Sequence, residues 1–227
     1  MPSLSQLLTD HGSLLVFDAA SLRVQVGLLR PNTPAVWRTT TDEAGRGIFT
    51  SSEAILCEAG LRIEEIGAFV FCEGPGSMLG TRTVAMALRT WQVLRPRQAF
   101  AYQSLAVAGY FDWVQHGRRD FAIIADARRD SWHRQQFSAT GELSLLQRIP
   151  TVELPAEELV MPENFRAWAT PPHPTRLCSY DLAQIFPALN DADFFRAVDA
   201  PDAFQHEAPE YKKWAAQVHS VETANKK

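Results

Sequence analysis

A strand–turn–strand pattern that occurs twice is the feature that most constrains the fold of this chain. The two segments are "SLLVFDAASLRVQVGLL", from Ser13, and "DFAIIADARRDSWHRQQFS", from Asp120. Each has a hydrophobic strand that ends in Asp-Ala, a short polar turn and an alternating second strand, so Asp18 and Asp126 hold matching places. Two copies of one hairpin predict a duplicated domain. Because a hairpin is a common unit, chance similarity is the alternative.

The segments between the two copies alternate between strand and helix patterns. Helices fit 46–60 and 80–95, where apolar residues recur at helical spacing, and short strands fit 66–71 and 98–103. An order of hairpin first, then strands that alternate with helices, argues for an α/β fold. The second half of the chain is looser, because seven of the 14 prolines lie between 150 and 187.

Composition argues against several classes of protein. The chain has 227 residues, a net charge of -4 and a pI near 5.9, and no basic stretch is long enough to predict direct nucleic-acid binding. The three cysteines form no C-x-x-C pair and no two of the six histidines stand four residues apart, so no zinc site is expected. The absence of a signal-peptide pattern and of a run of about 18 apolar residues predicts a cytoplasmic protein without membrane association.

The glycine-rich stretch "CEGPGSMLGTRT", at 72–83, lies between an expected strand and an expected helix. It is not a P-loop, because Gly80 is followed by Thr81 and not by Lys. The spacing of Gly74, Gly76 and Gly80 is one residue too long for a dinucleotide fingerprint, and Ser77 lacks the following glycine of a nucleophile elbow. What remains is a tight turn whose glycines take positive φ, or a general anion site at a helix N-terminus.

Asp18 and Asp126, at the ends of two expected strands, are the best candidates for acidic chemistry. In actin-like folds, aspartates of the hairpins hold a magnesium nucleotide, and glycines of the turns hold its phosphates. The turns here read Ala-Ala-Ser after Asp18 and Ala-Arg-Arg after Asp126, without glycine. The other interpretation is that each carboxylate accepts hydrogen bonds from the amides of its own turn.

Five segments resemble the TsaB family, also called YeaZ, and they follow the family's order. "GPGSMLGTRT" is similar to its "GPGSFTGLRIG", and "DARRDSWHRQQF" is similar to its "DARRGEVYWARY". "LLVFDAAS", "YQSLAVAG" and "APEYKKW" are similar to its first strand, its "VSSLEALA" and its late P-x-Y-x-R motif. The resemblance runs from about Leu14 to Trp214. The motif loop of the family corresponds to Gly74, Pro75, Gly76, Ser77, Gly80 and Arg82.

The resemblance implies an actin-like (ASKHA, ribonuclease H-like) α/β fold of two subdomains, the second reduced. The expected subdomains are residues 12–103 and 104–214, with 1–11 and 215–227 as flexible or peripheral termini. The chain would be a non-catalytic partner of TsaD, which binds ATP and a metal and forms N6-threonylcarbamoyladenosine in tRNA, with the ATPase TsaE as a further partner. It would have no cofactor of its own, would contact tRNA only through the complex, and would be able to form a homodimer when isolated. Asp18 and Asp126 would be vestigial acidic positions.

Small and weakly polar residues form a stripe on each of the two expected helices. The stripes consist of Gly47, Ser51, Ala54 and Glu58 on the first helix, and of Thr83, Ala87, Thr90 and Leu94 on the second. Small side chains let helices approach closely. The resemblance implies a four-helix bundle with TsaD at these stripes. The alternative is that the stripes pack on each other or on the protein's own sheet.

Two other classes of function remain open at the level of sequence. One is an active actin-like transferase or small-molecule kinase, which predicts nucleotide binding by the isolated chain. The other is a homodimeric binding module with no connection to tRNA modification. Identification of the protein that co-purifies with the chain separates these classes.

Overall fold

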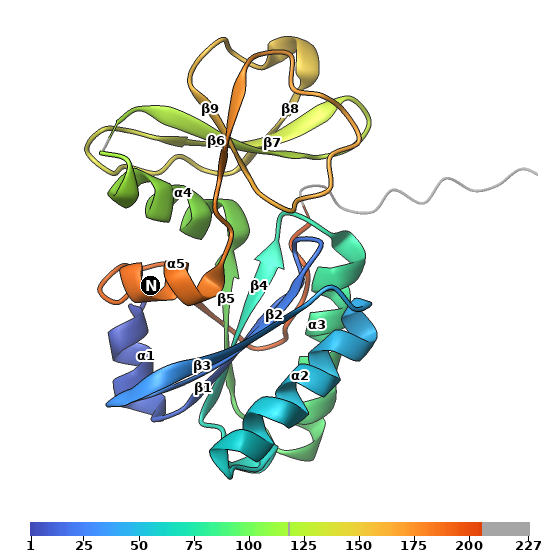
Figure 1. Cartoon of the computed structure of the whole chain (residues 1–227), viewed down its shortest axis with the longest axis vertical. Helices are drawn as coiled ribbons and strands as arrows, with labels where there is room; N and C mark the ends of the chain where they lie inside the picture. Colours follow the sequence, from blue (N-terminus) through green and yellow to red (C-terminus); the bar gives the residue numbers. More distant parts are fainter. Residues whose placement is uncertain (118, 206–227) are drawn as a thin grey trace, which may run out of the picture.

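The computed structural model describes residues 1–117 and 119–205, and these form two β-sheets with helices between and around them (Figure 1). The first sheet contains β1 (Leu14–Asp18), β2 (Val24–Arg30), β3 (Thr33–Thr40), β4 (Ala68–Gly74), β5 (Gln98–Gln103) and β11 (Arg196–Val198). The second sheet contains β6 (Phe121–Asp126), β7 (Ser131–Phe137), β8 (Gln147–Pro150), β9 (Leu159–Pro162) and β10 (Thr175–Cys178). The helices are α1 (Leu4–His11), α2 (Ala44–Ala59), α3 (Met78–Leu94), α4 (Ser104–Gln115) and α5 (Leu182–Ala188), with single 3-10 turns at Ile63–Glu65 and Thr151–Glu153.

The two sheets repeat one topology. Their strand orders are β5-β4-β1-β2-β3 and β10-β9-β6-β7-β8, and β11 adds a further strand to the edge of the first sheet. In each sheet a hairpin (β1–β2 or β6–β7) is antiparallel, and its first strand pairs in parallel with a later strand (β4 or β9). Asp18 pairs with Gln25, and Asp126 pairs with Trp132, so the two aspartates occupy the same position in the two copies. The duplication and the actin-like α/β class predicted from the sequence are confirmed.

The helices are divided between the two faces of the first sheet. Helices α2 and α3 pack on one face, where a core that includes Phe17, Phe69 and Ile48 is fully buried. Helices α1, α4 and α5 pack on the other face, in a core that also contains Ile123 and Val160 of the second sheet. Figure 1 shows α4 between the two sheets. One hydrophobic core therefore joins the subdomains.

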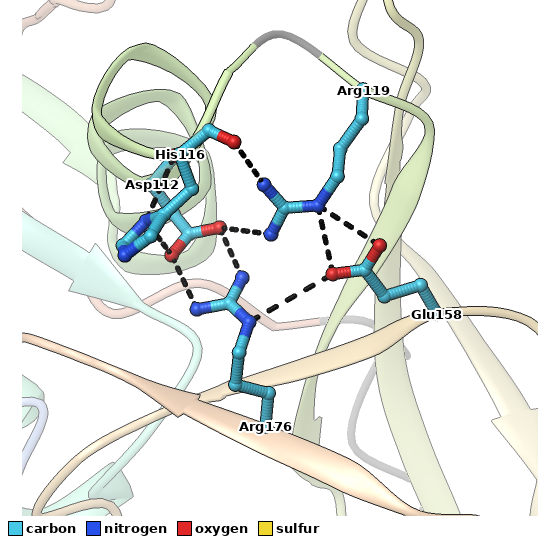
Figure 2. A network of polar contacts seen from close by, with 5 residues as sticks. All are labelled: Asp112, His116, Arg119, Glu158 and Arg176. Carbon is cyan, nitrogen blue, oxygen red and sulfur yellow. Dashed lines mark hydrogen bonds and ion pairs between the residues drawn. The ribbon is translucent and has the colours of Figure 1, made fainter.

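A network of charged residues fixes α4 to the edge of the second sheet (Figure 2). The side chain of Asp112, only 1% exposed, accepts hydrogen bonds from Arg176 at 2.8 and 2.5 Å and lies 3.5 Å from Arg119. Glu158 accepts from Arg119 at 2.8 and 2.9 Å and lies 3.8 Å from Arg176, while His116 lies 3.0 Å from Asp112. A carboxylate this deeply buried is stable only with such partners. The network holds the segment that connects the two sheets.

The expected subdomain limits need two corrections. Residues 1–11 are not a loose terminus, because α1 has a capping box between Ser3 and Gln6 and buries Leu4 and Leu7 in the core. The range 104–214 does not stay in one unit, because β11 returns to the first sheet and pairs with β5. The expected motif "APEYKKW" and the expected terminus 215–227 lie outside the described residues. None of the helices in residues 1–117 and 119–205 combines the length and the hydrophobicity that a membrane span requires.

Candidate functional site

The glycine loop turns β4 into α3 against the turn of the first hairpin. Gly74 and Gly76 have φ values of 115° and 149°, as the sequence predicts for a turn of this kind. A Cβ on Gly76 would lie 2.3 Å from the carbonyl oxygen of Ala20, and the amide of Ser77 donates to that oxygen at 2.7 Å. The group that approaches Gly76 closely is therefore the backbone of the same chain.

Gly80 and Ser77 serve the first turn of α3. Gly80 does not have positive φ, but a Cβ there would lie 2.0 Å from the carbonyl oxygen of Ala19. Glycine is needed at this position because a side chain would not fit against Ala19. This corrects the expectation that Gly80 adopts a left-handed conformation. The Ser77 hydroxyl accepts a hydrogen bond from the amide of Gly80 at 3.2 Å and acts as the N-cap of the helix. Pro75 is buried in this loop, and Arg82 is exposed on α3.

Asp18 is completely buried, and three donors satisfy its carboxylate. It accepts hydrogen bonds from the amide of Ala20 at 2.9 Å, from the hydroxyl of Tyr102 at 2.8 Å and from the hydroxyl of Tyr180 at 2.6 Å. Burial raises the pKa of Asp18 above its usual value, and the hydrogen bonds from Tyr180, Ala20 and Tyr102 oppose that increase. The two tyrosines could not be assigned from sequence, because they lie 84 and 162 residues away.

Asp126 joins two loops of the second subdomain. One oxygen accepts from the amide of Arg128 at 2.6 Å, and the other accepts from the amides of Trp168 and Ala169 at 2.6 and 2.9 Å. Both aspartates thus satisfy turn amides, which was one of the two sequence interpretations. Among residues 1–117 and 119–205, no group of three or more His, Cys, Asp or Glu could hold a metal ion.

A cleft of about 380 Å³ lies between the two subdomains. One wall is the turn after β1 together with the start of α3, and includes Ala20, Ser77 and Leu79. The facing wall comes from the β6–β7 turn and the loop at 165–168. In an actin-like fold this is where the hairpin aspartates would meet a nucleotide. Here Asp18 points into the core, and Asp126 is occupied by backbone amides.

The structure separates the residues expected at the partner interface into two groups. Gly47, Ser51 and Ala87 are buried inside the protein, which corrects their assignment to a free face. A Cβ on Gly47 would come within 3.0 Å of Thr40, so this part of α2 packs on the protein's own sheet. The exposed or partly exposed members are Ala54, Glu58, Thr83, Thr90 and Leu94. Glu58 forms an ion pair with Arg38 of β3.

An exposed apolar row runs along α3 beside these residues, and the small-residue pattern missed it. The row consists of Leu79, Met86 and Val93, which are 71%, 58% and 85% exposed. Residues seven apart share one face of a helix, so this spacing was the signal available in the sequence. The hydroxyls of Thr83 and Thr90 donate to main-chain carbonyls one turn earlier, at 2.8 and 2.9 Å, and therefore add little polarity to the face.

The duplicated sheets and the cleft between them define an actin-like chain whose acidic positions are occupied by its own donors. Two solved structures from Pseudomonas aeruginosa are similar to it. One is YeaZ, with a TM-score of 0.61 and 18% identity over 79% of this chain and 90% of that chain. The other is a protein described as similar to peptidase YeaZ, with a TM-score of 0.60 and 18% identity over 78% of this chain and 89% of that chain. The chain has the fold of the YeaZ proteins. No protein-family model matches the sequence, and no curated protein matches it.

Proposed function

We propose that this chain is a non-catalytic subunit that binds TsaD in the synthesis of N6-threonylcarbamoyladenosine in tRNA. The observation that carries the proposal is the exposed row of Leu79, Met86 and Val93 on α3, in a chain with the YeaZ fold. Exposed apolar residues that recur along one helix face are typical of a surface for a protein partner.

The geometry of the row suits a helix of another subunit. Leu79 to Val93 covers 14 residues of rise, or about 21 Å, along one face of α3. Phe49 of α2, 47% exposed, packs on Trp91 of α3 with ring centroids 5.4 Å apart, on the side of α3 that faces α2. In the proposed complex, helices of TsaD cover this face. A second copy of the chain would cover the same face in an isolated homodimer.

The state of the two acidic positions supports a role without catalysis. Asp18 accepts from two tyrosine hydroxyls and an amide, and Asp126 accepts from three amides, so neither presents a free carboxylate to the cleft. The proposal therefore places ATP and the metal on TsaD, gives this chain no cofactor, and brings in TsaE as a further partner in the cytoplasm. A kinase-like activity of this chain would need at least one of these carboxylates to be free.

Reconstitution of the modification tests this proposal. Cognate TsaD and TsaE, tRNA and the threonylcarbamoyl adenylate are incubated with and without the chain, and the modified adenosine is measured by mass spectrometry. We expect modification only when the chain is present, and no ATP turnover by the chain alone. Metal-dependent ATP turnover by the chain alone that disappears in Asp18→Asn would contradict the proposal and support the kinase alternative.

A further inference from the structure

Two arginines and a tryptophan gather on the second subdomain at the mouth of the cleft, and a third arginine, Arg129, follows Arg128 in the chain. The β6–β7 turn carries Arg128 and Arg129, and the loop at 165–168 carries Arg166 and Trp168. The guanidinium carbons of Arg128 and Arg166 lie 5.3 and 5.5 Å from the centroid of the Trp168 indole. We call these four residues the arginine–tryptophan cluster. They come from two separate segments of the chain, so the sequence contains no continuous basic stretch that would have predicted the cluster.

The backbone holds the cluster firmly in place. Asp126 accepts from the amides of Arg128 and Trp168, which ties the turn to the loop. The loop is also anchored to the first subdomain, because the amide of Leu22 donates to the carbonyl of Asn164 at 2.7 Å. The backbone that carries the cluster is therefore held in place before any ligand arrives, and binding would cost less conformational entropy.

The charges of the cluster are not neutralised by the protein. Across the described ranges 1–117 and 119–205, Arg128, Arg129 and Arg166 make no ion pair with a carboxylate. All three arginines are exposed, in a chain whose net charge is -4. Trp168 remains 64% exposed, so much of its indole is open to solvent. Guanidinium groups that lack a carboxylate partner, beside a largely exposed aromatic ring, are the combination that binds a phosphate backbone and stacks a base.

We propose that the arginine–tryptophan cluster contacts an RNA strand, with phosphates on the guanidinium groups and an unpaired base on Trp168. A strand fits better than a free magnesium nucleotide, because Asp18 and Asp126 are both occupied and the cluster lies on an open surface. The inference rests on the proposed function for one point, namely that the RNA is tRNA held by the complex.

The position of the cluster supports this assignment. Leu79 lines the same cleft as Arg128 and Trp168, and it is also the first residue of the apolar row on α3. A partner that covers the row would reach the mouth of the cleft beside the cluster. An RNA bound to that partner could then extend onto this chain, so the chain would contribute directly to RNA affinity.

Measurement of tRNA binding tests the inference. Unmodified tRNA transcript is titrated with the TsaD complex of the wild type, of Arg128→Glu/Arg166→Glu and of Trp168→Ala. The charge-reversal variant should bind about tenfold more weakly or worse and show a smaller dependence on salt concentration. Trp168→Ala should weaken binding about fivefold or more without changing that dependence. The matched control is Arg30→Glu, at the end of β2 away from the cleft, which should bind tRNA like the wild type.

The possible failures of the two proposals are distinguishable. Co-purification with TsaD is measured for each variant, and variants that keep TsaD but lose tRNA affinity support the RNA contact. If the wild type does not bind TsaD, the proposed function fails, and the same titration on the chain alone at low salt still decides the RNA contact. Unchanged tRNA affinity in both cluster variants would overturn the inference. Tight binding of AMP that depends on the cluster, with no effect on tRNA, would also overturn it and indicate a free nucleotide.

Discussion

The hydroxyl of Tyr180 donates a hydrogen bond of 2.6 Å to Asp18, a residue that lies 162 positions earlier in the chain. Tyr180 belongs to the segment that leads from the second sheet back to α5, and its carbonyl accepts from Arg23 at 3.0 Å and from Gln25 at 3.1 Å. The first hairpin is therefore hydrogen-bonded to the segment that connects the subdomains. Through Tyr180, the buried Asp18 therefore joins the first hairpin to the segment that connects the subdomains.

Tyr180→Phe should lower the free energy of unfolding by about 1–3 kcal/mol, because it removes one donor from a buried carboxylate. Urea denaturation followed by circular dichroism measures the change. Tyr110→Phe is a suitable control, because Tyr110 packs on Phe194 and its hydroxyl makes no hydrogen bond within the described residues. Equal stability of the Tyr180 variant and the wild type would show that the bond to Asp18 does not stabilise the fold.

The raised pKa of Asp18 predicts a dependence of stability on pH. Burial raises the pKa of Asp18 above that of the same side chain in the unfolded chain, so at pH values between the two the folded state binds more protons than the unfolded state. The contribution of Asp18 to stability is therefore present at low pH and decreases as pH rises through the folded-state pKa. Asp18→Asn, which resembles the protonated acid, should remove this dependence.

The measurement for Asp18 is a series of urea titrations of wild type and Asp18→Asn from about pH 4 to about pH 8. The unfolding free energy of the wild type minus that of the variant should decrease as pH rises. The difference cancels the titration of all groups that the two proteins share. A difference that stays constant or increases with pH would mean that the carboxylate is stabilised in its charged form.

Two parts of this structure show what sequence patterns can and cannot predict. The hairpins, the alternation of strands and helices and the glycine turn follow from local periodicity, and the structure has them. The burial of Gly47 and Ala87 could not be predicted from the sequence. A small residue on a helix is equally suited to packing on the protein's own sheet and to packing on another protein. The partners of Asp18 and the arginine–tryptophan cluster depend on segments that only the tertiary fold brings together.

Gly80→Ala should destabilise the protein by about 1–3 kcal/mol or more, because the new methyl group would overlap the carbonyl oxygen of Ala19. Thermal and urea denaturation measure the change. Gly45→Ala is the matched control, since Gly45 also lies in the first turn of a helix and an added Cβ would meet no atom within 4 Å beyond its chain neighbours and its own helix backbone. The control should be neutral or slightly stabilising. Equal effects of the two substitutions would contradict the close approach of α3 to the first hairpin.

Asp112→Asn should lower the free energy of unfolding by about 3 kcal/mol, because it leaves Arg119 and Arg176 facing a neutral amide. This is the low end of the range for a buried pair, since the two arginine side chains keep 27% and 35% exposure. Glu65→Gln, which removes an exposed ion pair with Arg62, should have little effect. A small effect of Asp112→Asn would mean that the hydrophobic core alone fixes α4.

The affinity of the purified chain for cognate TsaD tests the central claim most directly. Sedimentation or titration calorimetry should show a complex of the wild type with TsaD, and Val93→Glu, on the apolar row, should weaken it by roughly a hundredfold, because a charge would be buried without a partner. Val152→Glu is the matched control: it places the same charge on a valine that is 91% exposed in the second subdomain and should leave the affinity unchanged. Circular dichroism checks that both variants are folded. Tight binding of Val93→Glu, or no complex with the wild type, would contradict the account.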